Sequence, residues 1–565
     1  MPRCRGNRTT RLLALALACS GAGHAGFVAG QVRPPDAGRI QEQLRVPEPP
    51  RKPAAPQIRI EPQAGEAKPQ TAPFFVAAFR VRGATVFPEA QLVALLGEPR
   101  RDMTLAEVQA LAERITEFYR SRGYIVARAI IPPQEVRDGI VQVRVVEGRY
   151  ERIEIANASG ISERRIRGVL GGVREGAVVH GPTLERSVLL LSDLAGIQPR
   201  ATLEPGAQPG LTNLMLEIAP TRPFDFDVGL DNAGTSFTGR TRLSGGVVWN
   251  SPLNIGDRAS ARFITSGEGL RSARLGYDAP LGTSGLRGSA FASDTRYELG
   301  EEFASVEATG SAQSFGAAIL YPVIRSADRN LRVQFGGETR RLEDRLGAFD
   351  IVNEKSVHVL QWGGGGDLRD ALFGGGTTAF QALVSNGRLD LRTPMLVQDD
   401  AATTRAEGSF DKLSLAAQRL QRVTEKLRLA INYTAQFARN NLDSSEKFSV
   451  GGPSGVRAYP PGEAAGDDVQ LAQLELRYGA GTWLRGTLTP LVFVDYAHSR
   501  INHRTWAGFT GENVRELSGY GFGAEWNLTG QAFARGWYAR KLGNEAATAD
   551  TDRDSRLWLQ AGVLF

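Results

Sequence analysis

The sequence predicts two small α+β units followed by an all-β, sixteen-stranded transmembrane barrel. Three features carry this prediction: an export signal at the N-terminus, apolar residues at helical spacing between residues 74 and 221, and alternation of apolar and polar residues from residue 222 to the end at 565. Strands of about ten residues that alternate in this way are typical of transmembrane barrels. A soluble β-sandwich produces the same alternation, although usually in shorter strands.

The first 25 residues are expected to form a secretory signal peptide. Four arginines precede an apolar stretch at residues 12–19, and small residues follow up to Ala25. This order of charged, apolar and small segments is typical of a signal that is cleaved after export. A lipoprotein signal acylated at Cys19 is the alternative, but the residues before this cysteine match such a signal poorly.

Cleavage of the signal changes the composition of the mature chain. The formal charge of +6 loses the four arginines and becomes about +2, so the basic pI does not indicate a nucleic-acid partner. Both cysteines, Cys4 and Cys19, leave with the signal, which excludes disulfides, cysteine–metal sites and cysteine nucleophiles. No run of 18 apolar residues follows the signal, so no transmembrane helix is expected.

Residues 26–73 are predicted to hold a short N-terminal helix and a linker. The stretch "DAGRIQEQLR" at 36–45 has helical character, and ten prolines lie between residues 31 and 73. A segment so rich in proline and charge buries too little apolar surface to fold by itself. We therefore expect the chain after the helix to be extended.

Residues 74–150 and 151–221 are predicted to form two copies of one α+β unit. In the first copy, Thr104 and Glu107 are spaced as a capping box, and Gly123 lies where the following helix should end. Apolar residues recur at helical spacing after the box, which predicts the buried face of that helix. The order strand-helix-helix-strand-strand then appears again, so the two units form an internal repeat of about 75 residues.

Residues 222–565 are predicted to form the barrel. In "FDFDVGLDN" (224–232), apolar residues occupy one face of a strand, and acidic residues and glycine occupy the other. The final stretch, "RLWLQAGVLF", ends in the same way on the apolar Phe565. Dividing the whole region into such segments gives sixteen strands, an even number as expected for a closed barrel.

The sequence contains no catalytic or cofactor-binding motif, so we predict neither an enzyme nor a cofactor. It has no H-E-x-x-H, no Walker loop and no G-x-S-x-G. "GGGGD" at 363–367 lacks the helix that follows a phosphate-binding loop. The four histidines after the signal are scattered, and the last two are expected on a loop rather than at a metal site: His180, His358, His498 and His503.

Two short stretches carry charged residues in unusual positions. "GGPSGVRAYP" (451–460) places Arg457 in a run rich in Gly and Pro, for which an exposed loop is the simplest interpretation. In "TPLVFVDYAH" (489–498), the alternation puts Asp495 on the lumen face, where a single aspartate is ordinarily just hydrated. Three glycines in the next strand are interpreted as bulges or places of close backbone approach: Gly519, Gly521 and Gly523.

In their order along the chain, these segments resemble the TpsB transporters of two-partner secretion, the family of haemolysin-secretion and filamentous-haemagglutinin transporters. "GLDNAGTSFTGRTRLSGGVVWNSPLNIGD" (229–257) looks like the first barrel hairpin of that family. "GVRAYP" is similar to its Val-Arg-Gly-Tyr/Phe motif, and "FVDYA" is similar to its Phe-x-Asp-x-Gly motif. The resemblance covers nearly all of the chain after the signal.

The resemblance implies an architecture and a set of functional residues. The two α+β units would be POTRA domains, the 36–45 helix would plug the resting pore, and residues 439–467, after the eleventh strand, would fold back into the pore. In this arrangement Arg457 of the pore loop is held by Asp495 of the barrel wall. The motif residues are Gly451, Gly452, Val456, Arg457, Ala458 and Tyr459 in the loop, and Phe493, Asp495 and Ala497 in the strand.

The chain departs from the motifs of the family at two positions. Ala458 and Ala497 stand where the family has glycine. If position 458 requires a positive φ, alanine would cost about 1 kcal/mol there, and the tip of the loop would be shaped differently. Neither replacement removes a charged partner.

The function implied is that of an outer-membrane transporter. Its POTRA domains would recognise an unfolded exoprotein in the periplasm of a Gram-negative bacterium, and the exoprotein would be secreted through the barrel pore without nucleotide hydrolysis. The expected partners are a large exoprotein of the adhesin, haemolysin or toxin type, outer-membrane lipid, and the barrel assembly machinery, for which Phe565 is the expected C-terminal signal. No nucleic acid is expected.

Three other functions stay open at this point. An assembly factor of the same superfamily would insert other barrels, but such a factor usually carries more than two POTRA domains. A passive porin would not need the 148 residues between positions 74 and 221. A barrel enzyme such as an outer-membrane phospholipase would need a Ser–His constellation that the sequence does not indicate.

Overall fold

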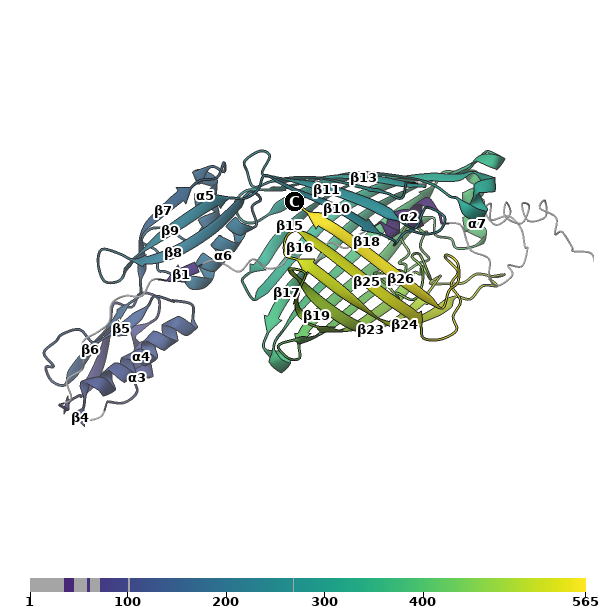
Figure 1. The fold of residues 1–565 in the computed structure, drawn as a ribbon. Helices are drawn as coiled ribbons and strands as arrows, with labels where there is room; N and C mark the ends of the chain where they lie inside the picture. The colour runs from purple at the N-terminus through teal and green to yellow at the C-terminus, as the bar shows by residue number, and fades with distance from the viewer. Residues whose placement is uncertain (1–34, 45–57, 61–71, 100–101, 268) are drawn as a thin grey trace, which may run out of the picture.

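Two α+β units lead into a closed β-barrel, and together they make an elongated molecule (Figure 1). The computed structural model describes residues 35–44, 58–60, 72–99, 102–267 and 269–565. The predicted fold class is confirmed, with α+β units at one end of a sixteen-stranded antiparallel barrel. The predicted signal peptide at 1–25 lies outside the described residues.

The first α+β unit packs two helices, α3 (Glu89–Leu96) and α4 (Leu105–Ser121), against a three-stranded sheet. The capping box begins α4 as predicted, because the Glu107 backbone N–H donates to Thr104 Oγ1 and the Thr104 N–H donates to Glu107 Oε2. Gly123 follows the end of α4 with a φ of 89°. The strands are β2 (Phe74–Phe75), β3 (Ala78–Arg82), β4 (Asp102–Met103), β5 (Arg128–Ile130) and β6 (Ile140–Val146), of which β3, β6 and β5 form the sheet and β2 pairs with β4.

The second unit repeats this order of strands and helices. Its helices α5 (Glu163–Leu170) and α6 (Gly181–Ser192) pack on a sheet whose strand order is β1-β8-β9-β7. The strands are β7 (Arg149–Asn157), β8 (Ile197–Pro205) and β9 (Leu211–Pro220). Strand β1 (Ile58–Ile60) comes from the segment predicted as linker and pairs in parallel with β8. The composition of this segment predicts an extended linker and no strand.

The barrel is a ring of sixteen strands in which each strand is antiparallel to its neighbours in the chain. The short β22 (Gly481–Trp483) continues β21 alongside β23, so it adds no position to the ring. The strands are β10 (Phe224–Asp231), β11 (Arg242–Asn250), β12 (Arg258–Thr265), β13 (Leu270–Pro280), β14 (Arg287–Glu298), β15 (Ala308–Arg325), β16 (Arg329–Leu346), β17 (Ile351–Asp370), β18 (Gly376–Leu391), β19 (Gly408–Arg422), β20 (Leu427–Ala438), β21 (Asp468–Tyr478), β23 (Gly486–Arg500), β24 (Val514–Leu528), β25 (Ala532–Lys541) and β26 (Ser555–Leu564).

Short helical segments lie in the connections between barrel strands. They are η1 (Glu301–Val306), η2 (Gly347–Phe349), η3 (Leu372–Gly374) and α7 (Pro394–Ala402). No helix among the described residues is both long and apolar enough to cross a bilayer.

The ring closes where the last strand pairs with the first. Strand β26 pairs with β10 from Asp227 opposite Leu564 to Asp231 opposite Gln560. The terminal Phe565 extends this pairing, since its N–H donates to the Phe226 carbonyl and its carbonyl accepts from the Phe226 N–H. Closure leaves no strand edge unpaired within the bilayer, where an unpaired backbone group costs several kcal/mol.

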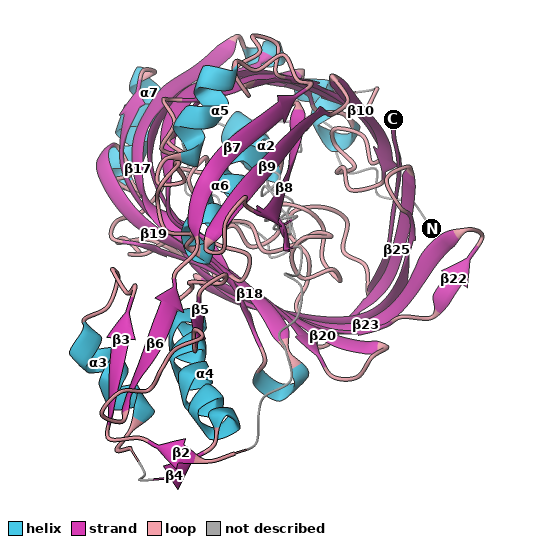
Figure 2. Cartoon of the chain, turned by 90° about the vertical axis from the view of Figure 1, so that its left-hand side faces the viewer, coloured by secondary structure: helices cyan, strands magenta, loops and turns pink. Residues whose placement is uncertain are grey.

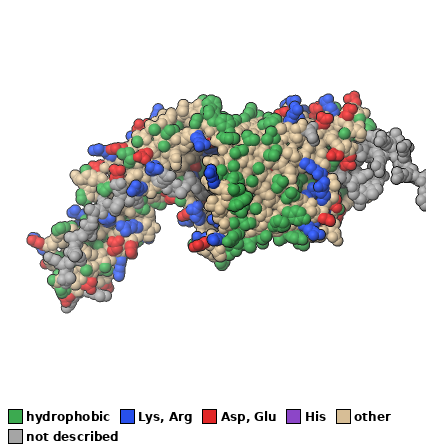
Figure 3. All heavy atoms as spheres, in the orientation of Figure 1, with side chains coloured by type: hydrophobic (Ala, Val, Ile, Leu, Met, Phe, Trp, Pro, Cys, Tyr) green, Lys and Arg blue, Asp and Glu red, His purple; other side chains and the backbone are tan. Residues whose placement is uncertain are grey.

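Alternation separates an apolar outer wall from the lumen. In β10 the apolar side chains point outward and are half exposed, as the sequence pattern predicts. Figure 3 shows hydrophobic side chains over much of the barrel wall on the face turned to the viewer, with charged side chains towards the two ends. This apolar wall is the surface that contacts lipid.

The second α+β unit is attached to the short turns at one end of the barrel. Asp193, after α6, accepts two hydrogen bonds of 2.9 Å from Arg325 at the end of β15. Glu185 of α6 accepts from the Ala327 N–H in the next turn at 2.8 Å. Figure 2, a view from this end, shows the unit in front of one side of the ring.

Glu147 organises the first unit from a buried position. Its carboxylate accepts from the Thr85 and Val86 backbone N–H groups at 2.6 and 2.8 Å and from the Tyr119 hydroxyl at 3.0 Å. Burial raises the pKa of Glu147, but the hydrogen bonds from Thr85 and Val86 outweigh burial and hold that pKa below its usual value. The carboxylate therefore stabilises the fold when it is ionised.

We expect Glu147→Gln to destabilise the first unit by about 1–3 kcal/mol at neutral pH, since hydrogen bonds to a charged group are lost. Because the pKa is lowered in the folded state, this contribution is present above the unfolded pKa of about 4.3 and is lost as pH falls through the folded value. The difference between the two proteins should therefore shrink in acid. Urea-dependent pulse proteolysis of the full chain measures both effects. Glu135→Gln, which alters an exposed ion pair with Arg137, is the matched control and should change little.

Candidate functional site in the barrel lumen

The segment 439–467 connects the eleventh and twelfth strands of the ring, β20 and β21, and most of its second half is buried. Its two arms are joined by paired backbone hydrogen bonds of 3.0 Å between Phe448 and Gly466. Near the tip, the Val456 N–H donates to the Val450 carbonyl at 2.7 Å. This pore loop is an ordered structure inside the lumen and is not the exposed loop that composition suggests.

Glycines allow the pore loop to fold back closely on itself. Gly452 has a φ of 90°, in the left-handed region that favours glycine. A Cβ on Gly451 would lie 2.0 Å from the Pro460 carbonyl oxygen, so no larger residue fits there. These two glycines therefore permit the turn that presents Arg457.

Arg457 and Asp495 form a buried, bidentate ion pair. Arg457 Nε donates to Asp495 Oδ2 at 2.9 Å, and Nη2 donates to Oδ1 at 2.7 Å. The Arg457 backbone N–H donates to the same carboxylate at 3.1 Å. Their exposed fractions are 2% and 0%. The planar guanidinium matches a carboxylate in a way that lysine does not.

Phe493 and Glu475 complete the surroundings of Arg457. The guanidinium carbon lies 3.5 Å from the centroid of the Phe493 ring, a cation–π contact. Arg457 Nη1 donates to Glu475 Oε1 at 2.7 Å, and the other Glu475 oxygen accepts from Arg477. Sequence reasoning did not name Glu475. The alternation in β21 places Glu475 on the lumen face, so the sequence pattern could have identified it as a candidate.

The remaining motif residues pack around this ion pair. Val456 and Tyr459 are buried with Leu517 of β24, and the Tyr459 hydroxyl donates to the Glu545 carbonyl at 3.1 Å. The Arg457 carbonyl accepts from the indole N–H of Trp558 in β26 at 2.7 Å. The loop tip thus touches strands from β21 to the closing strand of the ring.

The two alanines that replace family glycines are both fully buried. Ala458 is not among the residues with positive φ, so the backbone cost considered for alanine does not arise here. A Cβ on Gly519 would lie 2.7 Å from the Ala458 Cβ, so the methyl group of Ala458 occupies space that Gly519 leaves empty. A Cβ on Gly521 would similarly lie 2.6 Å from the ring of Phe493. Gly519 and Gly521 are therefore places of close approach.

The base of the pore loop has a second buried attachment, which sequence reasoning missed. Glu446 pairs with Arg340 of β16, and its other oxygen lies 2.7 Å from Lys412 Nζ of β19. Lys447 pairs with Asp467 at the far end of the loop at 2.7 Å. A single sequence gives no signal that charged residues on separate strands contact one another.

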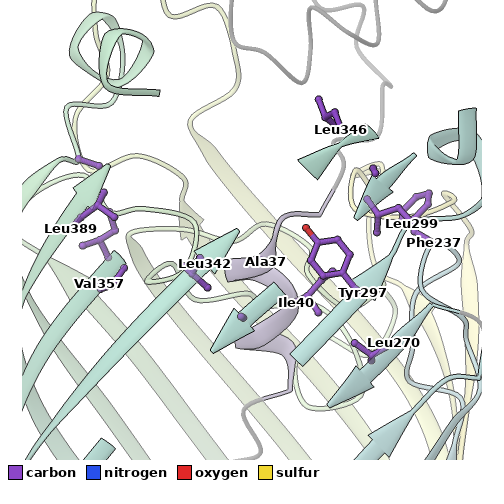
Figure 4. Close-up of a cluster of buried hydrophobic side chains, with 14 of the residues drawn as sticks. Ala37, Ile40, Phe237, Leu270, Tyr297, Leu299, Leu342, Leu346, Val357 and Leu389 are labelled. Carbon is purple, nitrogen blue, oxygen red and sulfur yellow. The ribbon is translucent and has the colours of Figure 1, made fainter. Parts of the chain in front are cut away.

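A short helix, α2 (Ala37–Gln43), lies inside the barrel beside the pore loop. Figure 4 shows Ala37 and Ile40 among apolar side chains of the wall, including Tyr297 and Leu342. Asp36 is the N-cap of the helix, and its carboxylate accepts from the Arg39 N–H at 2.9 Å. These residues fall within the 36–45 helix expected from the sequence.

Polar contacts join α2 to the pore loop. Arg39 Nη2 donates to the Gly462 carbonyl at 2.8 Å, and the Ser449 hydroxyl donates to Glu42 at 2.7 Å. Lys355 of β17 lies 3.0 Å from Asp443 of the loop and 3.7 Å from Asp36. The helix and the loop therefore share one lysine.

The histidines do not gather at a site. His498 lies in strand β23 and not on the expected loop, because the pairing of β23 with β24 continues to Arg500, whereas His503 lies in the connection that follows. His503 Nδ1 lies 2.9 Å from Asp468, and His498 Nδ1 lies 3.5 Å from Glu516. Within the described ranges, no group of three or more His, Cys, Asp or Glu side chains is arranged to hold a metal ion.

Two families of known proteins match this chain. Residues 210–526 match the family described as haemolysin secretion/activation protein ShlB/FhaC/HecB, and residues 74–148 match the POTRA domain, ShlB-type. Among curated relatives, the heme/hemopexin transporter protein HuxB of Haemophilus influenzae (strain 86-028NP) is 27% identical over 80% of this chain and 80% of its own length. The hemolysin transporter protein ShlB of Serratia marcescens is 24% identical over 88% and 86%.

Among solved structures, CdiB from Escherichia coli has the same fold. It aligns with a TM-score of 0.71 at 20% identity and covers 89% of this chain and 92% of its own. At that identity the likeness concerns the fold alone.

We expect Arg457→Ala to release the loop tip, because it leaves two carboxylates facing each other in a buried site. The cost should be about 3–5 kcal/mol, and Asp495→Ala should cost less because Arg457 keeps Glu475. The double variant should cost no more than Arg457→Ala, because removal of Asp495 also removes one of the two unpaired carboxylates. Protease accessibility of the loop measures release of its tip, and the temperature at which the folded barrel is lost measures the change in stability.

Arg477→Ala is the matched control, because Arg477 contacts the same Glu475 but is partly exposed. It should leave the loop protected. A protected loop and an unchanged unfolding temperature in Arg457→Ala would contradict the role given to the ion pair.

Proposed function

Since the chain belongs to the haemolysin secretion/activation family (ShlB/FhaC/HecB), and is therefore an outer-membrane transporter of two-partner secretion, we propose that it moves one large exoprotein from the periplasm through its own lumen without hydrolysing a nucleotide. Its POTRA units lie in the periplasm. The absence of a Walker loop from the sequence supports transport without a nucleotide. The driving force would then come from folding of the exoprotein outside the cell.

This proposal rests on the pore loop and the helix α2, which both lie in the lumen and are attached to the barrel wall. The pore loop is held by the buried pair of Arg457 and Asp495, and α2 packs beside it. A passive porin would keep an aqueous channel, whereas a transporter for a folding chain needs a pore that is closed at rest. We therefore propose that α2 is the resting plug and that Arg457 and Asp495 hold the loop in a position needed for secretion.

The partner would be a surface-acting protein of adhesin, haemolysin or toxin type. The relatives named above are described as hemolysin and heme/hemopexin transporters, which supports this class. We propose further that the barrel assembly machinery inserts the chain and recognises Phe565. Its ring is 61% exposed on the outer wall, where another protein can reach it before insertion.

Capture of the exoprotein would occur by addition of a strand to a POTRA sheet. An edge strand offers unpaired N–H and C=O groups to any extended chain, so it can bind an unfolded partner with little dependence on sequence. The second unit already accepts such a strand, since Ile58 pairs opposite Ala201 at the edge of β8. This pairing supports strand addition as the mode of capture.

Removal of residues 74–221 tests the proposed function. We expect secretion of the partner exoprotein to fall to background while the barrel still inserts, because capture and translocation reside in different parts of the chain. Secretion is measured in the culture medium, and insertion by the shift in gel mobility on boiling. Normal secretion by the shortened chain would refute capture, and a general loss of other barrels from the outer membrane would favour an assembly factor.

The plug is tested by filling the space at Gly38. A Cβ there would lie 2.6 Å from the Ser445 Cβ of the pore loop, so Gly38→Ala should push α2 away. We expect longer channel openings in planar bilayers, with secretion retained. The Ser445 Cα and backbone nitrogen would lie at 2.7 and 2.8 Å from the added Cβ as well, so a smaller side chain at position 445 could not relieve the clash. Openings of unchanged duration in Gly38→Ala would mean that α2 is not the plug.

A further inference from the structure

Among the described residues, the second α+β unit covers one side of the periplasmic rim of the barrel and leaves the rest of this rim open. The β11–β12, β13–β14 and β15–β16 turns lie against the second α+β unit. The Ala195 N–H donates to the Gly256 carbonyl at 3.2 Å, and Arg287 Nη1 donates to the Asp193 carbonyl at 3.2 Å. The contact between Ala327 and Glu185 completes this covered side.

The three turns that follow in the ring, β17–β18, β19–β20 and β21–β23, carry large apolar side chains that are exposed. Phe373 is 89% exposed and Leu484 is 68% exposed, values unusual even for surface residues. We call these residues the apolar rim: Leu372, Phe373, Val423, Trp483 and Leu484.

The β17–β18 turn holds Phe373 in a fixed and unfavourable conformation. Phe373 has φ 49° and ψ 39°, the left-handed region that bulky residues rarely adopt. Gln421 of β19 donates to the carbonyls of Leu372 and Phe373, both at 3.0 Å, and Asp370 accepts two hydrogen bonds from Arg419. A strained residue that the surroundings hold in place indicates a functional constraint.

The β21–β23 turn of the apolar rim forms a hairpin that projects out of the ring of strands. Strand β22 pairs with the start of β23, and the turn residues Leu484 and Arg485 have φ of 47° and 64°. The Trp483 carbonyl accepts from the indole N–H of Trp526 at 2.8 Å, which fixes the hairpin to the outer wall. Figure 2 shows this hairpin outside the ring of strands. Its apolar tip therefore points away from the lumen.

We propose that the apolar rim inserts into the phospholipid of the periplasmic leaflet and anchors the uncovered side of the barrel there. The rim is continuous with the lipid-facing wall, which ends at exposed apolar residues on the same strands. Arg422, Lys426 and Arg485 are exposed on the same turns, where they complement phosphate groups. Tryptophan and leucine beside basic residues are the composition of interfacial anchors.

This anchor occupies the part of the ring that the second α+β unit leaves uncovered, beginning at the β17–β18 turn. A chain drawn through the lumen pulls on the barrel, and an anchor at the uncovered side resists tilting of the pore mouth. The tips lie outside the ring, so the exported chain does not meet them on its path. The anchor thus adds a lipid-binding surface to the transporter.

Single-cysteine labelling tests the proposal, because the chain after Ala25 carries no cysteine. Phe373→Cys and Leu484→Cys are labelled with the NBD fluorophore in the full-length protein and reconstituted into phospholipid vesicles. Thr529→Cys, in the exposed polar β24–β25 turn, is the matched control, and Val492→Cys reports the lipid-facing wall. Correct folding of each variant is checked by its shift in gel mobility on boiling.

We expect shallow doxyl-labelled lipid to quench the probes at 373 and 484 at least about twofold more than the probe at 529, since interfacial anchors lie only roughly 5–10 Å deep. Aqueous iodide should quench them correspondingly less. Iodide quenching equal to that at 529 would overturn the proposal. Protection from iodide without lipid quenching would also overturn it, because a protein would then cover the rim. If either labelled variant fails to fold, the other, or Val423→Cys, decides between these outcomes.

Discussion

The buried guanidinium of Arg457 determines how the lumen is arranged. Removing a charge from water is costly, and this site tolerates it only because two carboxylates and an aromatic ring surround the group. Asp495 and Phe493 come from β23, and Glu475 comes from β21 beside it. Because all three lie on two neighbouring strands, the tip of the pore loop can be held at only one place on the wall.

The helix α2 and the pore loop contact each other but are attached to the wall by different residues. The loop has its own attachments at both ends, Arg457 at the tip and Glu446 at the base. The helix α2 adds apolar contacts to the wall and a few hydrogen bonds to the loop, and Lys355 lies between the two. The helix can therefore leave without breaking the ion pair of Arg457.

The outer surface of the barrel faces lipid instead of water. Alternation turns apolar side chains outward along every strand, and closure between β10 and β26 pairs the backbone that lipid cannot satisfy. At the periplasmic end the same surface meets the second α+β unit on one side. On the other side the apolar surface continues into the β17–β18 and β21–β23 turns, which carry Phe373 and Leu484. Hydrogen bonds from neighbouring strands hold both turns in place.

The sequence by itself determined the features that depend on local periodicity. A period of two predicts the lumen face of Asp495 and the sixteen strands, and a capping box predicts the start of α4, because side-chain direction follows from position along a strand or helix. Family motifs paired Arg457 with Asp495. Only the tertiary structure decided contacts between distant segments: Glu475 as the second carboxylate, Glu446 between Arg340 and Lys412, the methyl group of Ala458 against Gly519, and β1 on β8. Such pairs depend on which strands become neighbours and on how close two backbones lie, and a single sequence carries no local signal for either.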